Sequence, residues 1–147
     1  MPKPLNDQDQ QSFLAERHVA VLSVARGPGR APLSTPIWYG YEPGGNVTFF
    51  TGVNASKLRI IQHAGAVSLT VQREEPPYKF VSISGTVVST DSPPSSDQIF
   101  AIASRYMPED AARWMASATA ETRGYELILL TIRPDRWQSA DYTDDMT

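Results

Sequence analysis

The chain has 147 residues, of which 41% are hydrophobic and 20% charged, a composition typical of one globular domain spanning residues 1–147. Its 13 basic and 16 acidic residues leave a net charge of −3, which argues against a nucleic-acid partner, because such a partner requires a concentrated basic face. The lack of cysteine excludes disulfides and thiolate chemistry, and two isolated histidines, His18 and His63, argue against a metal site.

The termini and apolar runs give no indication of a membrane partner. The longest apolar runs are far shorter than a membrane span, and the N-terminus is rich in Gln and Asp rather than basic and then apolar. We therefore expect a cytoplasmic protein.

The first half of the chain is predicted to contain one helix and three strands. Residues 6–17 begin with a capping-type residue and carry an apolar face, which indicates a short helix. Residues 19–25 are apolar and β-branched, and a Gly-Pro-Gly turn joins them to an extended run over residues 33–41, so the two are predicted to form a hairpin. After another glycine-rich turn, residues 47–51 are expected to form a third antiparallel strand.

The next segments continue the predicted sheet. Residues 66–72 alternate apolar and polar side chains, which indicates a fourth strand with one buried face. A loop with two prolines follows, because proline cannot join a ladder of hydrogen bonds. Residues 79–90 are then expected to form a long strand, in which Gly85 indicates a bulge or a bend.

A helical insertion precedes the end of the predicted sheet. A helical stretch is expected to open at Ser92, and a second helix at Pro108. Residues 125–133 are predicted to form a sixth strand, and a turn at residues 134–135 separates it from a predicted seventh strand over residues 136–142. Six or seven antiparallel strands with short connections and a helical insertion indicate a mainly β fold, a small barrel capped by helices.

Two cations, Lys57 and Arg59, lie in the first turn of the helix expected after residues 47–51. A helix N-terminus carries partial positive charge and unpaired N–H groups, so cations are unfavourable there unless an anion lies beside them. Phosphate is the commonest such anion. The alternative is a surface helix with two solvated cations and Asn54 or Ser56 as its N-cap, since one disfavoured charge costs only ~0.3–1 kcal/mol.

Several short segments occur in an order and at a spacing that resemble a known family, the split-barrel flavin and deazaflavin oxidoreductases, also called the pyridoxamine 5′-phosphate oxidase-like superfamily. The resemblance covers most of the chain. Its segments are residues 19–23, then Ser34, Thr35, Pro36, Ile37, Trp38 and Tyr39, then Phe50, Thr51 and Gly52 with Ser56, Lys57 and Arg59, and finally residues 134–137.

The resemblance implies a split β-barrel homodimer that binds FMN or the deazaflavin F420 in two grooves along the subunit interface. It assigns the phosphate of the cofactor to Ser56 and Lys57, with Arg59 as a further contact. It places residues 34–38 along the ring system, and Thr51 and Gly52 near the ribityl chain. Adjacent strand residues face opposite sides, so we expect Trp38 to face the cofactor and Tyr39 to be structural. Pro77 and Tyr78 are candidates for lining the substrate space.

F420 is our first choice of cofactor and FMN the second. The arrangement of segments and the arginine-rich composition favour F420, which is an association rather than a physical argument. A departure from the family pattern favours FMN instead. Many F420-binding members carry further cations after the lysine, whereas Arg59 is followed here by Ile60 and Ile61, which leaves fewer cations for a polyglutamate tail.

We expect an oxidoreductase that transfers a hydride from reduced F420 or FMN to a small organic acceptor such as an activated double bond. No Ser/His/Asp constellation, carboxylate pair or Walker-type glycine loop is visible, which fits an enzyme whose cofactor carries the chemistry. No catalytic residue is assigned. One alternative is a carrier that binds flavin, F420 or a tetrapyrrole without turnover, and another is a structural barrel that binds nothing.

Overall fold

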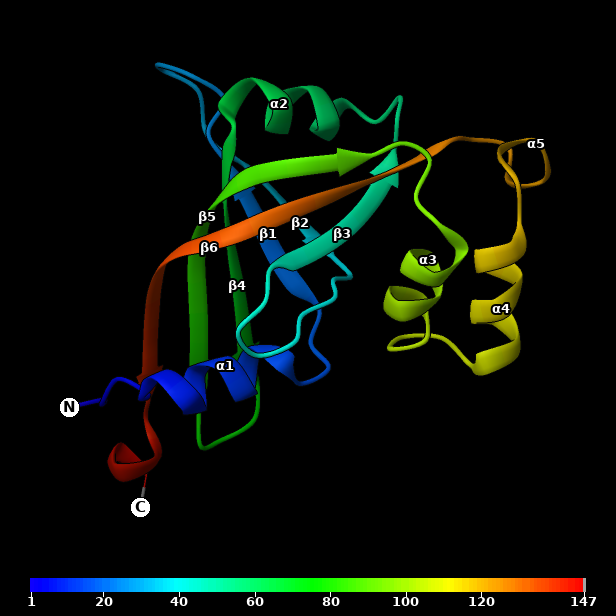
Figure 1. The fold of residues 1–147 in the computed structure, drawn as a ribbon. Helices are drawn as coiled ribbons and strands as arrows, with labels where there is room; N and C mark the ends of the chain where they lie inside the picture. The colour runs from blue at the N-terminus through cyan, green and yellow to red at the C-terminus, as the bar shows by residue number, and fades with distance from the viewer. Residues whose placement is uncertain (147) are drawn as a thin grey trace.

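The computed structural model describes residues 1–146, in which one antiparallel sheet of six strands curls into a half-barrel (Figure 1). The strands are β1 (Ala20–Val24), β2 (Leu33–Ile37), β3 (Val47–Gly52), β4 (Ala66–Arg73), β5 (Lys79–Asp91) and β6 (Leu127–Asp141). The helices are α1 (Asp7–Ala15), α2 (Ser56–Ala64), α3 (Ser96–Ala103), α4 (Glu109–Ser117), α5 (Ala120–Arg123) and the 3₁₀ turn η1 (Thr143–Asp145). The predicted mainly β class is confirmed. Within residues 1–146, none of the helices has the length and apolarity needed to cross a membrane.

The sheet has the strand order β2-β1-β4-β5-β6-β3, so β2 and β3 are its two edges. These edges meet at one point beyond the end of β2. There the Gly40 N–H donates to the Thr48 carbonyl over 2.8 Å, and the Thr48 N–H donates back over 2.9 Å. A Cβ at Gly40 would lie 2.9 Å from Thr48 Oγ1, so a larger residue there would have to displace the Thr48 side chain.

The predicted turn at residues 134–135 and the seventh strand are wrong, because β6 runs through Pro134 without interruption. The missing N–H of Pro134 falls at an irregularity of the ladder, where the β5–β6 register shifts between Ser84 and Gly85. A Cβ at Gly85 would lie 2.5 Å from the Arg133 carbonyl oxygen, so glycine permits the close approach. The predicted bulge at Gly85 is thereby confirmed.

The core lies inside the curl of the sheet. Alternate residues of each strand point inward, as in β3, where Val47, Phe49 and Thr51 are buried. Helix α1 adds Phe13 and Leu14 to the same cluster and lies across one end of the sheet. Helices α3 and α4 pack against each other at the side of the half-barrel (Figure 1).

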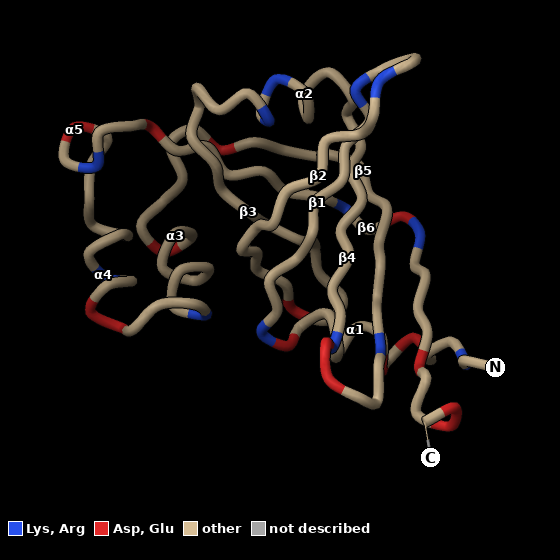
Figure 2. Tube along the Cα trace, turned by 180° about the vertical axis from the view of Figure 1, so that it is seen from behind, with Lys and Arg blue, Asp and Glu red and all other residues tan. Residues whose placement is uncertain are grey.

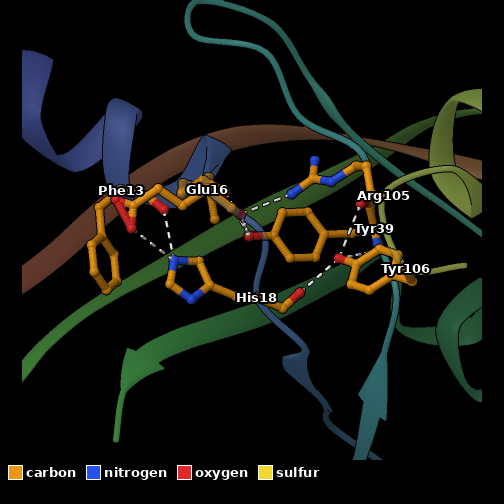
Figure 3. Close-up of polar contacts among 7 residues, drawn as sticks. Phe13, Glu16, His18, Tyr39, Arg105 and Tyr106 are labelled. Carbon is orange, nitrogen blue, oxygen red and sulfur yellow. Dashed lines mark hydrogen bonds and ion pairs between the residues drawn. The ribbon is translucent and has the colours of Figure 1, made fainter. Parts of the chain in front are cut away.

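Tyr39 joins α1 to the sheet from within the core, which confirms its predicted structural role. Its side chain is fully buried, and its hydroxyl donates to the carbonyl of Leu14 over 2.5 Å. The Arg105 guanidinium lies 4.8 Å from the centre of the Tyr39 ring and donates to the Glu16 carbonyl (Figure 3). Burial raises the pKa of the Tyr39 hydroxyl well above its usual value.

We predict that Tyr39→Phe reduces the loss of stability at alkaline pH. Because the pKa is raised only in the folded state, the unfolded chain ionises first, and the stabilisation is lost as the pH rises above the ordinary value of 10.0. Tyr39→Phe also leaves the Leu14 carbonyl without this donor, which costs about 1–2 kcal/mol at neutral pH.

Urea unfolding at about pH 8 and about pH 11 measures both effects. Tyr78→Phe is the control, because the Tyr78 side chain is 42% exposed, and it should unfold as the wild type does at both values. An alkaline loss of the same size in wild type and Tyr39→Phe would contradict the assignment.

Candidate functional site

A groove of about 440 Å³ lies between the end of β2, the outer face of β3 and the first turn of α2. We call it the Lys57 groove, and its lining residues are Val19, Pro36, Ile37, Trp38, Phe50 and Lys57. It brings together four of the residues that the sequence assigned to the cofactor: Pro36, Ile37, Trp38 and Lys57. Its walls are apolar and aromatic except at the lysine, so it combines a cationic point with a surface for a flat ring.

The N-terminus of α2 has the unfavourable composition that the sequence indicated. The N-cap is Ala55, whose side chain cannot accept a hydrogen bond, and the first turn contains no acidic residue. The proposed caps Asn54 and Ser56 are therefore wrong, because the helix begins one residue after Ala55 and neither side chain caps it. Helix N–H groups and a cation thus meet at one end of the groove, an arrangement suited to an anion.

Lys57 is half-buried, and burial lowers the pKa of its amine. None of the ion pairs found within residues 1–146 involves this lysine. A partly desolvated ammonium without a carboxylate is unfavourable in the free protein. A phosphate in the groove would supply the missing counter-charge and restore the pKa of Lys57 toward its ordinary value.

Ser56 and Arg59 lie outside the lining of the Lys57 groove, and both are exposed. Helix geometry explains the separation of the two cations, because residues two positions apart on a helix do not face the same side. Arg59 contributes instead to the charge of this end of the molecule. Figure 2 shows basic residues on α2 and on the turn between β1 and β2, which carries Arg26 and Arg30.

The remaining residues assigned to the ring and the ribityl chain do not line the groove. Ser34 and Thr35 precede the lining part of β2, and the Ser34 hydroxyl lies 3.4 Å from that of Ser23. Thr51 is 6% exposed, because the alternation of β3 turns its side chain into the core. Gly52 ends β3, opposite Leu127 of β6.

Pro77 and Tyr78 lie in the loop between β4 and β5, at the end of the sheet away from α2 (Figure 1). Tyr78 lines a different hollow of about 290 Å³ together with Tyr142. Its carbonyl accepts a hydrogen bond of 2.9 Å from the Tyr142 N–H. Within one chain, Pro77 and Tyr78 therefore lie away from the Lys57 groove.

Sequence reasoning missed two residues of the groove and one behind it. Phe50 could have been found, because the alternation that buries Phe49 and Thr51 turns Phe50 outward. Val19 lies just before β1 and is 54% exposed. Tyr106 stacks on Trp38 with ring centres 4.9 Å apart and planes 5° apart, and no local pattern places residue 106 beside residue 38.

The curled sheet and the Lys57 groove define a split-barrel protein of the kind that the sequence resembles. The family model of pyridoxamine 5′-phosphate oxidase matches residues 7–139. The chain belongs to this family, whose members include flavin-binding oxidoreductases. No curated protein sequence matches the chain.

Solved structures with the same fold carry different descriptions. An F420 reductase is 19% identical with a TM-score of 0.67, and the match covers 86% of this chain and 94% of the reductase. A FAD-binding protein from Mesorhizobium loti is 15% identical with a TM-score of 0.68, over 96% of this chain and 98% of that protein. A heme storage protein from Vibrio cholerae is 11% identical with a TM-score of 0.60, over 90% and 91% of the two chains. These similarities establish the shared fold.

We predict that Lys57→Met raises the Kd for FMN and for F420 by about 10- to 100-fold, because a phosphate bound in the groove would lose a charge-assisted contact. Arg59→Met, the matched loss of a cation on the same helix, should change the Kd for FMN, which has no acidic tail, by less than about threefold, because Arg59 lies outside the groove. Fluorescence titration measures each Kd.

Riboflavin provides a control without a phosphate. Lys57→Met should bind it as the wild type does. Equal weakening of FMN and riboflavin by Lys57→Met would show that the lysine does not contact the phosphate.

Proposed function

We propose that the chain is an oxidoreductase that binds F420, or as second choice FMN, in the Lys57 groove and transfers a hydride to an activated double bond of a small organic acceptor. The proposal depends on one observation: at the uncapped N-terminus of α2, beside an apolar groove wall, Lys57 is half-buried and forms no ion pair within the described residues. Family membership makes a flavin-type cofactor the anion that best suits this site.

In this proposal the residues of the groove bind the cofactor, orient its ring and exclude water from it. Lys57 and the first N–H groups of α2 hold the phosphate. Pro36, Phe50 and Trp38 contact the ring and displace water from it. A reduced cofactor bound there would supply a hydride to one carbon of the acceptor's double bond. Among the lining residues only Lys57 has a titratable side chain, and it is assigned to the phosphate, so in this proposal the proton for the other carbon comes from solvent.

F420 is placed before FMN because a protein of the same fold is described as an F420 reductase. The cations of α2 and of the β1–β2 turn support the same order, because they give this end of the molecule a positive field for an acidic tail. The FAD-binding protein of the same fold supports the second choice.

The proposal includes a homodimer with the cofactor at the interface. The outer face near the groove carries three exposed apolar side chains, Val19, Val21 and Trp38, with exposures of 54%, 43% and 41%. Val21 lies directly opposite Pro36 in the β1–β2 ladder, so these side chains form one strip beside the Lys57 groove. A second copy on this strip would remove it from water and give the open groove a second wall.

An anaerobic assay with reduced F420 or reduced FMN and a panel of enones and quinones tests the activity. We expect the absorbance of the oxidised cofactor to recover only when both protein and acceptor are present, and Lys57→Met to lower kcat/KM at least about tenfold. Cofactor binding without turnover of any acceptor would overturn the enzyme in favour of the carrier. Recovery without an acceptor would also overturn it.

Light scattering after size exclusion tests the dimer. We expect twice the chain mass of 16.2 kDa, and a monomer for Val21→Glu, because a carboxylate in the strip cannot be desolvated without a partner. Trp114→Glu is the control, because Trp114 is 55% exposed on α4, away from the strip, and should leave the mass unchanged. A monomeric wild type would contradict the proposed interface.

A further inference from the structure

At the end of the β1–β2 ladder, beside the Lys57 groove, a side-chain hydroxyl takes the place of a backbone hydrogen bond. Continued past Ala20 and Ile37, the register would bring Val19 opposite Trp38 and then His18 opposite Tyr39. The hydroxyl of Tyr106 occupies that position instead. It accepts a hydrogen bond from the Tyr39 N–H over 3.2 Å and donates one to the His18 carbonyl over 2.6 Å. The hydroxyl thus replaces a direct bond between the two strands.

The turn that carries Tyr106 follows α3 and is held on both sides (Figure 3). Its neighbour Arg105 donates to the Glu16 carbonyl over 2.8 Å and lies against the Tyr39 ring. The imidazole of His18 lies 2.9 Å from the Phe13 carbonyl, which fixes the chain at the end of α1. Tyr106 is therefore a fixed side chain inserted between two fixed backbones.

This insertion has two consequences for the groove. The hydroxyl bridge separates the backbones of His18 and Tyr39 by more than one hydrogen bond would. Val19 and Trp38, which adjoin those two residues, both line the groove, so the separation sets the width of the groove at this end. The Tyr106 ring also covers one face of the Trp38 indole through the stacked contact, which fixes the indole relative to the groove.

We propose that Tyr106 is a positioning residue that sets the width of the ring-binding end of the Lys57 groove and the orientation of Trp38. The segment between β5 and β6, outside the sheet, thereby controls the shape of the site that accepts the flat ring. The inference rests on the proposed function for its effect on cofactor binding. Its effect on Trp38 rests on the contacts alone.

The test uses full-length protein with Trp114→Phe and Trp137→Phe, which leaves Trp38 as the one remaining tryptophan of three. Tyr106→Leu removes both the ring and the hydroxyl, and Tyr106→Phe removes only the hydroxyl. Tyr125→Leu is the control, because Tyr125 is 47% exposed and lies beyond α5. Circular dichroism establishes that each variant is folded.

We expect Tyr106→Leu to increase acrylamide quenching of Trp38 and to raise the Kd for the bound cofactor about fivefold, the effect of losing one aromatic stack. Tyr106→Phe should keep the quenching of the parent protein and raise the Kd about twofold, because the stack remains while the strand ends close. Tyr125→Leu should change neither quantity. In a Trp38→Leu background, the effect of Tyr106→Leu should shrink to that of Tyr106→Phe.

The outcomes separate this inference from the proposed function. If the parent protein binds neither FMN nor F420, the proposed function fails, and the quenching series alone decides whether Tyr106 orients Trp38. If the parent protein binds cofactor and Tyr106→Leu changes neither quenching nor Kd, the inference is overturned while the function stands. If Tyr106→Leu does not fold, Tyr106→Phe decides, and an unchanged Kd in that variant overturns the inference.

Discussion

The bend of the β5–β6 ribbon is the constraint on which the rest of the structure depends. β6 pairs with β5 along most of its length and also carries β3 on its first half. At Gly85 the two backbones approach so closely that a Cβ would collide with the Arg133 carbonyl. The bend there turns the sheet back on itself and brings β3 round to β2. Phe50 of β3 and Trp38 after β2, at opposite edges of the sheet, therefore line one groove.

The sequence predicts most of the sheet, because period-two alternation and glycine-rich turns are local signals. It fails at Pro134, where a proline that usually marks a turn is accommodated within a strand by the irregularity opposite Gly85. At the site, the charge pattern of α2 identifies Lys57. It does not separate Lys57 from Arg59, because their difference depends on which side of the helix faces β2. The sequence does not predict the place of Tyr106 at the site, because its stack with Trp38 joins segments far apart in the chain.

The Lys57 groove concentrates features that do not serve stability. The N-cap of α2 is Ala55, which has no capping side chain, and the first turn carries cations. Lys57 is half-buried and forms no ion pair within residues 1–146. Asn6 caps α1, and Ser95 and Gln98 form a capping box on α3, whereas α4 lacks a side-chain cap as α2 does. The helices α1, α3, α4 and α5 nevertheless each carry an acidic residue in the first turn. Among the described helices, α2 alone has a first turn with cations and no acidic residue, and a local departure of this kind is expected at a functional site.

The two edges of the half-barrel are joined by the backbone bridge between Gly40 and Thr48 alone among the described residues. Every other junction in the sheet is a ladder of several consecutive pairs, so opening this seam breaks far fewer hydrogen bonds than opening any strand pair. The amide protons of Gly40 and Thr48 should therefore exchange with solvent through local fluctuations, whereas those of β5 and β6 should exchange only on global unfolding. The Lys57 groove has β2 on one side of this seam and β3 on the other. It therefore opens where the fewest backbone hydrogen bonds hold neighbouring strands together.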